Sequence, residues 1–142
     1  MVDFQDIQKM EDPETIKSFL FGGNATFTLK SLKSGSHYTY KMKTPKNKKH
    51  HYKRYLYVMT GTDNEYHYKY IGSVYKNKFF SNITGFDIAK KGFEWFFCNI
   101  LSKHVPETVE VYHSMRCAKC GRKLTTPESV KIGFGPVCKG KI

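Results

Sequence analysis

Cysteine and histidine residues near the C-terminal end have the spacing of a metal site. Cys117 and Cys120 form a C-x2-C pair, His113 lies upstream, and Cys138 lies downstream, which gives H-x3-C-x2-C-x17-C. A tight turn can direct both sulfur atoms of a C-x2-C pair to one ion, and Gly121 suits such a turn. Three thiolates and one imidazole make the closed tetrahedral set of a structural zinc ion. The sequence therefore predicts one structural Zn²⁺ bound by Cys117, Cys120, Cys138 and His113.

The fourth ligand is the open part of this assignment. His113 shares one face of a predicted strand with Val109 and Val111, so its imidazole is expected to point inwards, beside the C-x2-C turn. Cys98 is the main alternative, but it lies in the middle of a predicted helix with no turn to present it. His104 lies further away, in a predicted loop. The hypothesis of His113 as fourth ligand is preferred because thiolates with one imidazole are a common structural zinc set.

Positive charge is concentrated in one part of the chain. The net charge is +12, yet residues 1–23 sum to −3, whereas residues 24–58 carry nine Lys or Arg and no acid. The densest run, 41–54, is broken by Pro45 and Asn47, which predicts an exposed hairpin loop. Such a loop attracts phosphates in a salt-dependent way. The predicted contacts are Lys46, Lys48, Lys49, Lys53 and Arg54, with Arg122 added from the zinc segment. A loop that only increases solubility is the alternative.

The elements that must position these residues are predicted from periodicity and turn signals. Asp12 and Pro13 begin a helix that runs to Leu20 or Phe21 and stops at Gly22-Gly23. Strands are expected over 25–32, 37–42, 55–60, 68–75 and 79–80. Strict alternation in the fourth of these would place Tyr68, Tyr70, Gly72 and Val74 on one face. Short turns between the strands indicate an antiparallel meander.

A helical period then appears over residues 86–101, with apolar side chains on one wide stripe. The stripe consists of Ala89, Phe93, Phe96, Phe97 and Ile100. This helix is expected to cover one face of the sheet, and a last strand follows over 109–113. The predicted fold class is therefore α+β, an antiparallel meander covered by one aromatic-rich helix, with a C-terminal zinc knuckle. Residues 1–108 would form the meander domain with its N-terminal helix, and 109–142 a zinc segment packed on it as one unit.

The C-terminal segment resembles a domain family of unknown function that is common in small phage and prophage proteins. The matching residues are His113, Cys117-Ala-Lys-Cys120-Gly-Arg-Lys-Leu-Thr125, Pro127-Glu-Ser-Val130 and Gly133-Phe-Gly-Pro-Val-Cys138. The close resemblance covers about 30 residues. It implies a zinc knuckle and a phage or mobile-element origin, and it implies no activity.

Three classes of function follow from these features. A tyrosine-rich sheet with a lysine-rich hairpin favours a phage-type accessory protein that binds nucleic acid, either single strands or the backbone. The alternative is a counter-defence or host-takeover factor that binds a host protein or nucleoprotein complex. An enzyme is the least favoured class, because the zinc site is closed and no P-loop, Ser/His/Asp order or paired carboxylate motif is present. With no apolar stretch of 18 residues and no secretory signal, the expected location is the cytoplasm of a bacterial host cell.

Overall fold

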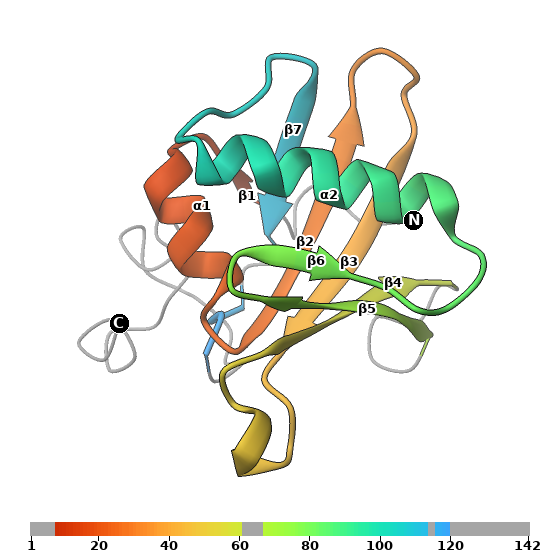
Figure 1. Ribbon diagram of the computed structural model, residues 1–142. Coiled ribbons are helices and arrows are strands. Elements are labelled where there is room, and N and C mark those ends of the chain that lie inside the picture. Colours follow the sequence, from red (N-terminus) through yellow and green to blue (C-terminus); the bar gives the residue numbers. More distant parts are fainter. Residues whose placement is uncertain (1–7, 61–66, 114–115, 120–142) are drawn as a thin grey trace.

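One antiparallel sheet and two helices make up the computed structural model, which describes residues 8–60, 67–113 and 116–119 (Figure 1). The strands have the order β1-β7-β2-β3-β4-β5-β6 in the sheet. The elements are β1 (Gln8–Met10), α1 (Pro13–Leu20), β2 (Asn24–Ser31), β3 (His37–Lys43), the short 3-10 helix η2 (Lys48–His50), β4 (Arg54–Met59), β5 (Tyr68–Tyr75), β6 (Lys78–Phe80), α2 (Asp87–Leu101) and β7 (Val109–His113). The predicted α+β class is confirmed. Within the described residues, neither α1 nor α2 is long and apolar enough to cross a membrane.

The meander occupies only part of the sheet. Strands β2 to β6 follow one another as predicted, but β7 returns to pair with β2, and β1 pairs with the outer side of β7. The register sets His113 opposite both Phe27 of β2 and Gln8 of β1. β1 has three residues and was not predicted. Because β7 lies inside the sheet, residues 109–113 share one sheet with the segment upstream of residue 108.

Helix α1 begins and ends where its sequence signals predict. The Asp12 side chain accepts a hydrogen bond from the backbone N–H of Thr15 at 2.9 Å, and Pro13 occupies the first helical position. The chain leaves the helix through Gly22 and Gly23, and Gly23 has a φ of +107°, a conformation that L side chains rarely adopt. The connection from α1 to β2 is therefore short and tightly bent.

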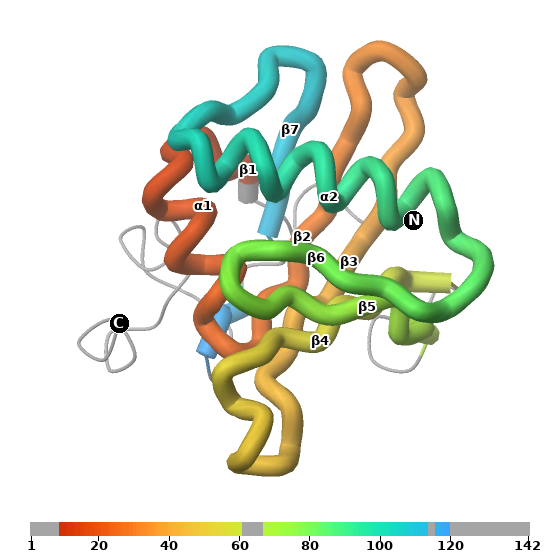
Figure 2. Tube along the Cα trace, in the orientation of Figure 1, coloured from red at the N-terminus to blue at the C-terminus, as the bar shows by residue number. Residues whose placement is uncertain are grey.

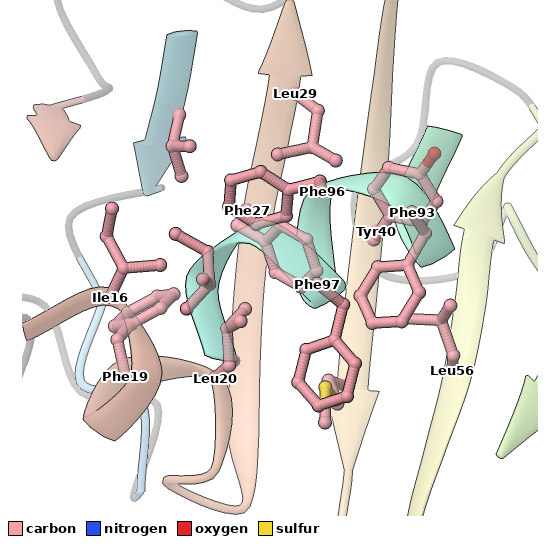
Figure 3. Packing of buried hydrophobic residues seen from close by; sticks show 14 of the residues in the cluster. Ile16, Phe19, Leu20, Phe27, Leu29, Tyr40, Leu56, Phe93, Phe96 and Phe97 are labelled. Atoms are coloured by element: carbon pink, nitrogen blue, oxygen red, sulfur yellow. The ribbon is translucent and has the colours of Figure 1, made fainter. Parts of the chain in front are cut away.

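A cluster of aromatic rings fills the space between the helices and the sheet (Figure 3). Figure 2 shows α2 crossing over the strands, with α1 beside its C-terminal end. The buried Phe93 ring of α2 is central: its centroid lies 6.2 Å from Phe27, 5.8 Å from Tyr40, and 5.5 Å from both Phe79 and Phe97. This confirms the predicted aromatic stripe as core. Rings at such separations stabilise the fold beyond the area they bury.

The opposite side of the sheet, turned away from α1 and α2, is called the outer face below. Cross-strand register places Thr28 of β2 opposite Thr39, and their hydroxyl groups lie 2.8 Å apart on this face. Strict alternation along β5 was the wrong expectation. The register shifts between Leu56 and Tyr57, as at a β-bulge, so that these residues face Gly72 and Tyr70. Ile71 is the extra residue that is left unpaired.

The bulge changes which β5 side chains share a face. N-terminal to it, Tyr68 and Tyr70 lie on the outer face opposite Met59 and Tyr57. C-terminal to it, Gly72 and Val74 are buried towards the core. Strict alternation would place all four of these residues on one face. In the structure, the two tyrosines lie on the outer face, whereas Gly72 and Val74 face the core.

Candidate functional site

Two of the four predicted zinc ligands lie within the described residues, and both are buried. His113 ends β7 on its core side, and its ring centroid lies 5.4 Å from that of Phe19 on α1. Cys117 follows at the start of a turn and is equally buried. The backbone N–H of Lys119 donates a hydrogen bond to the Cys117 Sγ at 3.4 Å. The sulfur atom of this predicted ligand thus accepts a hydrogen bond from the backbone of its own turn.

The turn that carries Cys117 packs against the connection between α1 and β2. The backbone N–H of Asn24 donates to the Ala118 carbonyl oxygen at 2.6 Å. A Cβ atom added at Gly22 would lie 2.7 Å from the Ala118 Cβ, a separation that real structures do not show. Gly22 is therefore the residue that lets the two backbones approach, and this contact fixes the position of Cys117.

The remaining predicted residues of the zinc segment, Cys120, Cys138 and Arg122, lie outside the described residues. Among the residues that are described, no group of three His, Cys, Asp or Glu side chains gathers. Cys98, the alternative ligand, is exposed on α2, whereas His113 is fully buried. The assignment of zinc to these residues stays a prediction.

The basic hairpin, residues 44–53 between β3 and β4, projects beyond the end of the sheet (Figure 1). Lys46, Lys48 and Lys49 are exposed, and Lys53 is partly exposed. The Asn47 side chain accepts a hydrogen bond from the Lys49 backbone N–H at 3.0 Å and thereby caps η2. The structure thus places these four lysines in a folded loop that faces solvent, as the sequence predicted for the hairpin.

Arg54 differs from these lysines. Its guanidinium group donates hydrogen bonds to the carbonyl oxygens of His51 and Lys53, each at 2.9 Å, and of Phe21 at 3.1 Å. Partial burial lowers the pKa of Arg54 from its usual range, but the group stays charged at neutral pH. The sequence grouped it with the phosphate contacts, whereas the structure shows it joining the base of the hairpin to the end of α1.

The sequence indicated a tyrosine-rich sheet but not which of its tyrosines gather on the outer face. The Tyr70 ring centroid lies 5.6 Å from that of Tyr55 and 5.9 Å from that of Tyr57. Nearer the hairpin, Tyr52 and Tyr75 lie 5.1 Å apart, edge to face. Alternation along β4 is a sequence signal that places Tyr55 and Tyr57 on one face. The face on which Tyr70 lies depends on the bulge between β4 and β5.

Lysine side chains accompany these rings. Lys53 Nζ lies 5.6 Å from the centroid of Tyr52, and Lys76 Nζ lies 5.3 Å from that of Tyr75. Lys41 Nζ lies 4.4 Å from the Tyr68 centroid, which is a cation–π distance. Burial raises the pKa of Tyr68 to about 12, so that its hydroxyl group is neutral at physiological pH.

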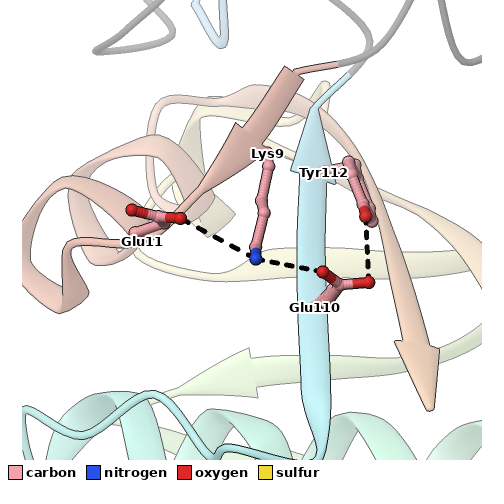
Figure 4. A network of polar contacts seen from close by, with 4 residues as sticks. All are labelled: Lys9, Glu11, Glu110 and Tyr112. Carbon is pink, nitrogen blue, oxygen red and sulfur yellow. Dashed lines mark hydrogen bonds and ion pairs between the residues drawn. The ribbon is translucent and has the colours of Figure 1, made fainter. Parts of the chain in front are cut away.

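Carboxylates gather at the other edge of the sheet (Figure 4). Lys9 Nζ lies 3.0 Å from a Glu110 carboxylate oxygen and 3.7 Å from one of Glu11, and the Tyr112 hydroxyl donates to Glu110 at 3.0 Å. The hydrogen bond from Lys9 is the main cause that lowers the pKa of Glu110. By contrast, residues 24–60 and 67–86, which include β2 to β6, contain twelve Lys or Arg and no Asp or Glu.

The comparisons with known proteins assign residues 108–142 to a domain of unknown function. The matching family is described as a family of unknown function (DUF6011), and the match spans β7 and the predicted zinc segment. This is the segment whose motifs resemble such a family. Neither the search of curated proteins nor the search of solved structures found a match.

Proposed function

We propose that this chain is a small basic accessory protein of phage type that binds nucleic acid through the basic hairpin and holds one structural zinc ion. The observation that carries the proposal is the distribution of charge. Residues 24–60 carry nine Lys or Arg and no Asp or Glu, and Lys46, Lys48 and Lys49 on the hairpin are exposed. A segment that carries charge of one sign attracts polyanions by releasing the counterions condensed on them.

The zinc part of the proposal rests on the surroundings of Cys117 and His113. Both are buried, His113 against Phe19 of α1 and Cys117 in a turn that contacts the connection between α1 and β2, and a backbone N–H donates to the sulfur atom. A buried thiol and a buried imidazole at the start of a C-x2-C turn fit the closed, structural class of zinc site. In this class the metal ion stabilises the local fold, so its role would be to order the C-terminal segment against α1.

A triple substitution tests the hairpin. Replacing Lys48, Lys49 and Lys53 together by Gln should weaken binding to single- and double-stranded probes alike. The slope of log affinity against log salt should fall by roughly 2–3, because each lost phosphate contact removes ~0.7–0.9. Fluorescence anisotropy at several salt concentrations measures both quantities, and circular dichroism checks that the fold is unchanged.

A matched control removes the same charge elsewhere. Lys33, Lys91 and Lys103 are exposed and lie in the β2–β3 loop, on α2 and after α2, outside the hairpin. Their joint replacement by Gln should leave the salt slope near that of the parent. Equal effects of the two triple variants would mean that only net charge matters. A parent protein that binds no probe at low salt would refute the proposal.

A second candidate function has one observation in its favour. Ile88 and Trp95, seven residues apart on α2, are 73% and 48% exposed. Exposed apolar side chains on one helix are a feature of protein-binding surfaces. The corresponding proposal is a phage counter-defence or host-takeover factor that binds a host protein or nucleoprotein. Its binding should survive high salt and nuclease treatment, and Trp95→Ser should abolish it.

A further inference from the structure

We infer that tyrosines on the outer face form a stacking surface for the unpaired bases of a single-stranded nucleic acid. This inference rests on the proposed function and specifies its ligand and its site. The surface consists of Tyr52, Tyr55, Tyr57, Tyr70 and Tyr75, and is called the tyrosine track below. It begins on β4 and β5 and leads to the basic hairpin.

The first argument is continuity. Tyr70 contacts both Tyr55 and Tyr57, and Tyr52 contacts Tyr75. Tyr55 of β4 is paired with Ser73 of β5, and Tyr75 lies two residues beyond Ser73 on β5. Tyr55 and Tyr75 therefore share the outer face. The two groups of rings therefore follow each other along β4 and β5. An extended chain lying on this face would meet successive aromatic rings.

The second argument is accessibility. Tyr52 and Tyr70 are 55% and 37% exposed. Their contacts are edge to face, with interplanar angles of 66° for Tyr52 with Tyr75 and 82° for Tyr70 with Tyr55. A perpendicular pair brings the edge of one ring against one face of the other, so the remaining ring faces are not used by that contact.

The third argument is charge. In the register of β3 with β4, Lys41 pairs with Tyr57 and Lys43 pairs with Tyr55, so that a lysine lies beside each of these rings. At the other end of the track, Lys53 and Lys76 lie over the rings of Tyr52 and Tyr75. Alternating rings and cations suit a ligand that alternates bases and phosphates, and stacking on an aromatic ring does not depend on the base. In a duplex the base faces are already stacked, so the track should favour single strands.

The experiment compares leucine and phenylalanine at two positions of the track. The probes are a fluorescein-labelled 20-nucleotide single strand, as DNA and as RNA, and the DNA duplex of the same sequence. Tyr70→Leu and Tyr52→Leu should each weaken single-strand binding about 5- to 150-fold, the effect of losing one stacked base. Tyr70→Phe and Tyr52→Phe keep the ring and should stay within about twofold of the parent. The leucine variants should leave duplex affinity and the salt slope unchanged.

Tyr112→Leu is the matched control. Tyr112 lies on the same outer face, but beside Glu110 and away from the track, so its loss should leave single-strand affinity unchanged. The inference is overturned if Tyr70→Leu and Tyr52→Leu bind the single strands as the parent does, or if phenylalanine lowers affinity as much as leucine. In either case the proposed function stands, provided that the variant with Lys48, Lys49 and Lys53 replaced by Gln binds nucleic acid more weakly than the parent. If the parent binds neither single strands nor duplex, both the inference and the proposed function fail.

Discussion

Gly22→Ala should displace the turn that carries Cys117, although it adds only one methyl group. The new Cβ would lie 2.7 Å from the Ala118 Cβ and 2.8 Å from the Ala118 carbonyl oxygen. Ordinary carbon–carbon contact requires about 3.5–4.0 Å, so the turn must move by roughly 1 Å. Overpacking of this kind costs about 1–3 kcal/mol. If zinc binding requires the docked turn, affinity for the metal should fall by up to about 5- to 150-fold.

Gly92→Ala provides the control for this substitution. Gly92 lies on the exposed side of α2, and a Cβ there would meet its nearest neighbour, the Tyr40 hydroxyl oxygen, at 3.9 Å. This is ordinary contact, and alanine in a helix interior is favoured over glycine by about 0.5–1 kcal/mol. Urea denaturation should therefore show Gly22→Ala destabilised and Gly92→Ala stabilised. Competition with a colorimetric chelator should show weaker zinc binding for Gly22→Ala alone. Similar stability of the two variants would refute the packing argument.

Three further predictions concern single side chains. His113→Ala should greatly weaken zinc retention, measured by elemental analysis after dialysis, while Cys98→Ser should not. Tyr40→Phe removes the hydrogen bond that its buried hydroxyl donates to a carbonyl oxygen of α2 at 2.8 Å, and should cost about 0.5–1.5 kcal/mol in urea denaturation. Because Lys9 lowers the pKa of Glu110, this carboxylate stabilises the fold above its unfolded pKa, and the stability is lost as pH falls through the folded pKa. Glu110→Gln should reduce that acid-side loss in thermal unfolding between about pH 3 and 6.

The sequence was sufficient for the elements whose signals are local. Helix α1 has a capping Asp12 and a terminal pair of glycines, and α2 has an aromatic stripe with the helical period. Strands β2, β3, β4 and β5 are separated by turn residues, so each was predicted within a residue or two of its observed bounds. Local signals of this kind depend on a few neighbouring residues and need no knowledge of the partners.

Pairing between strands far apart in the chain could not be predicted from the sequence. The insertion of β7 between β1 and β2 joins segments about a hundred residues apart, and no local pattern specifies it. The bulge opposite Leu56 and Tyr57 is a property of the pairing between β4 and β5, and it decides on which face Tyr70 lies. The tyrosine track was therefore not visible in the sequence, although the predicted hairpin beside it was.

The residues of the candidate sites, too, could be predicted from the sequence only where the signal is local. Spacing alone proposes Cys117, Cys120 and Cys138 as ligands, because the C-x2-C pair is a local signal. Composition alone proposes the cationic hairpin. Neither signal identifies Arg54 as a residue that binds carbonyl oxygens, since its partner Phe21 lies 33 positions away in the chain. A basic run can therefore contain both lysines exposed to solvent and cations that bind the protein's own carbonyl oxygens, and only tertiary contacts distinguish the two.

The connection between α1 and β2 joins the two candidate sites, and this leads to a last prediction. Two of its carbonyl oxygens accept hydrogen bonds from the base of the hairpin. The Phe21 oxygen accepts from the Arg54 guanidinium group, and the Gly23 oxygen accepts from the Thr44 N–H at 3.0 Å. On its other side, Asn24 binds Ala118 of the cysteine turn.

Removal of zinc should therefore loosen the hairpin base as well as the cysteine turn. When hydrogen exchange is measured with and without a chelator, the protection of the Asn24 amide should fall further than that of the other amides. The reason is that its acceptor, the Ala118 carbonyl oxygen, belongs to the cysteine turn. The Thr44 amide should lose less, and the amide of Leu56 in the sheet interior should keep its protection. If Thr44 exchanges at the same rate in both states while Asn24 does not, the connection transmits nothing to the hairpin. Loss of protection at both amides would mean that zinc loading stabilises the shape of the cationic loop, so that a structural metal ion influences nucleic-acid affinity without contacting the ligand.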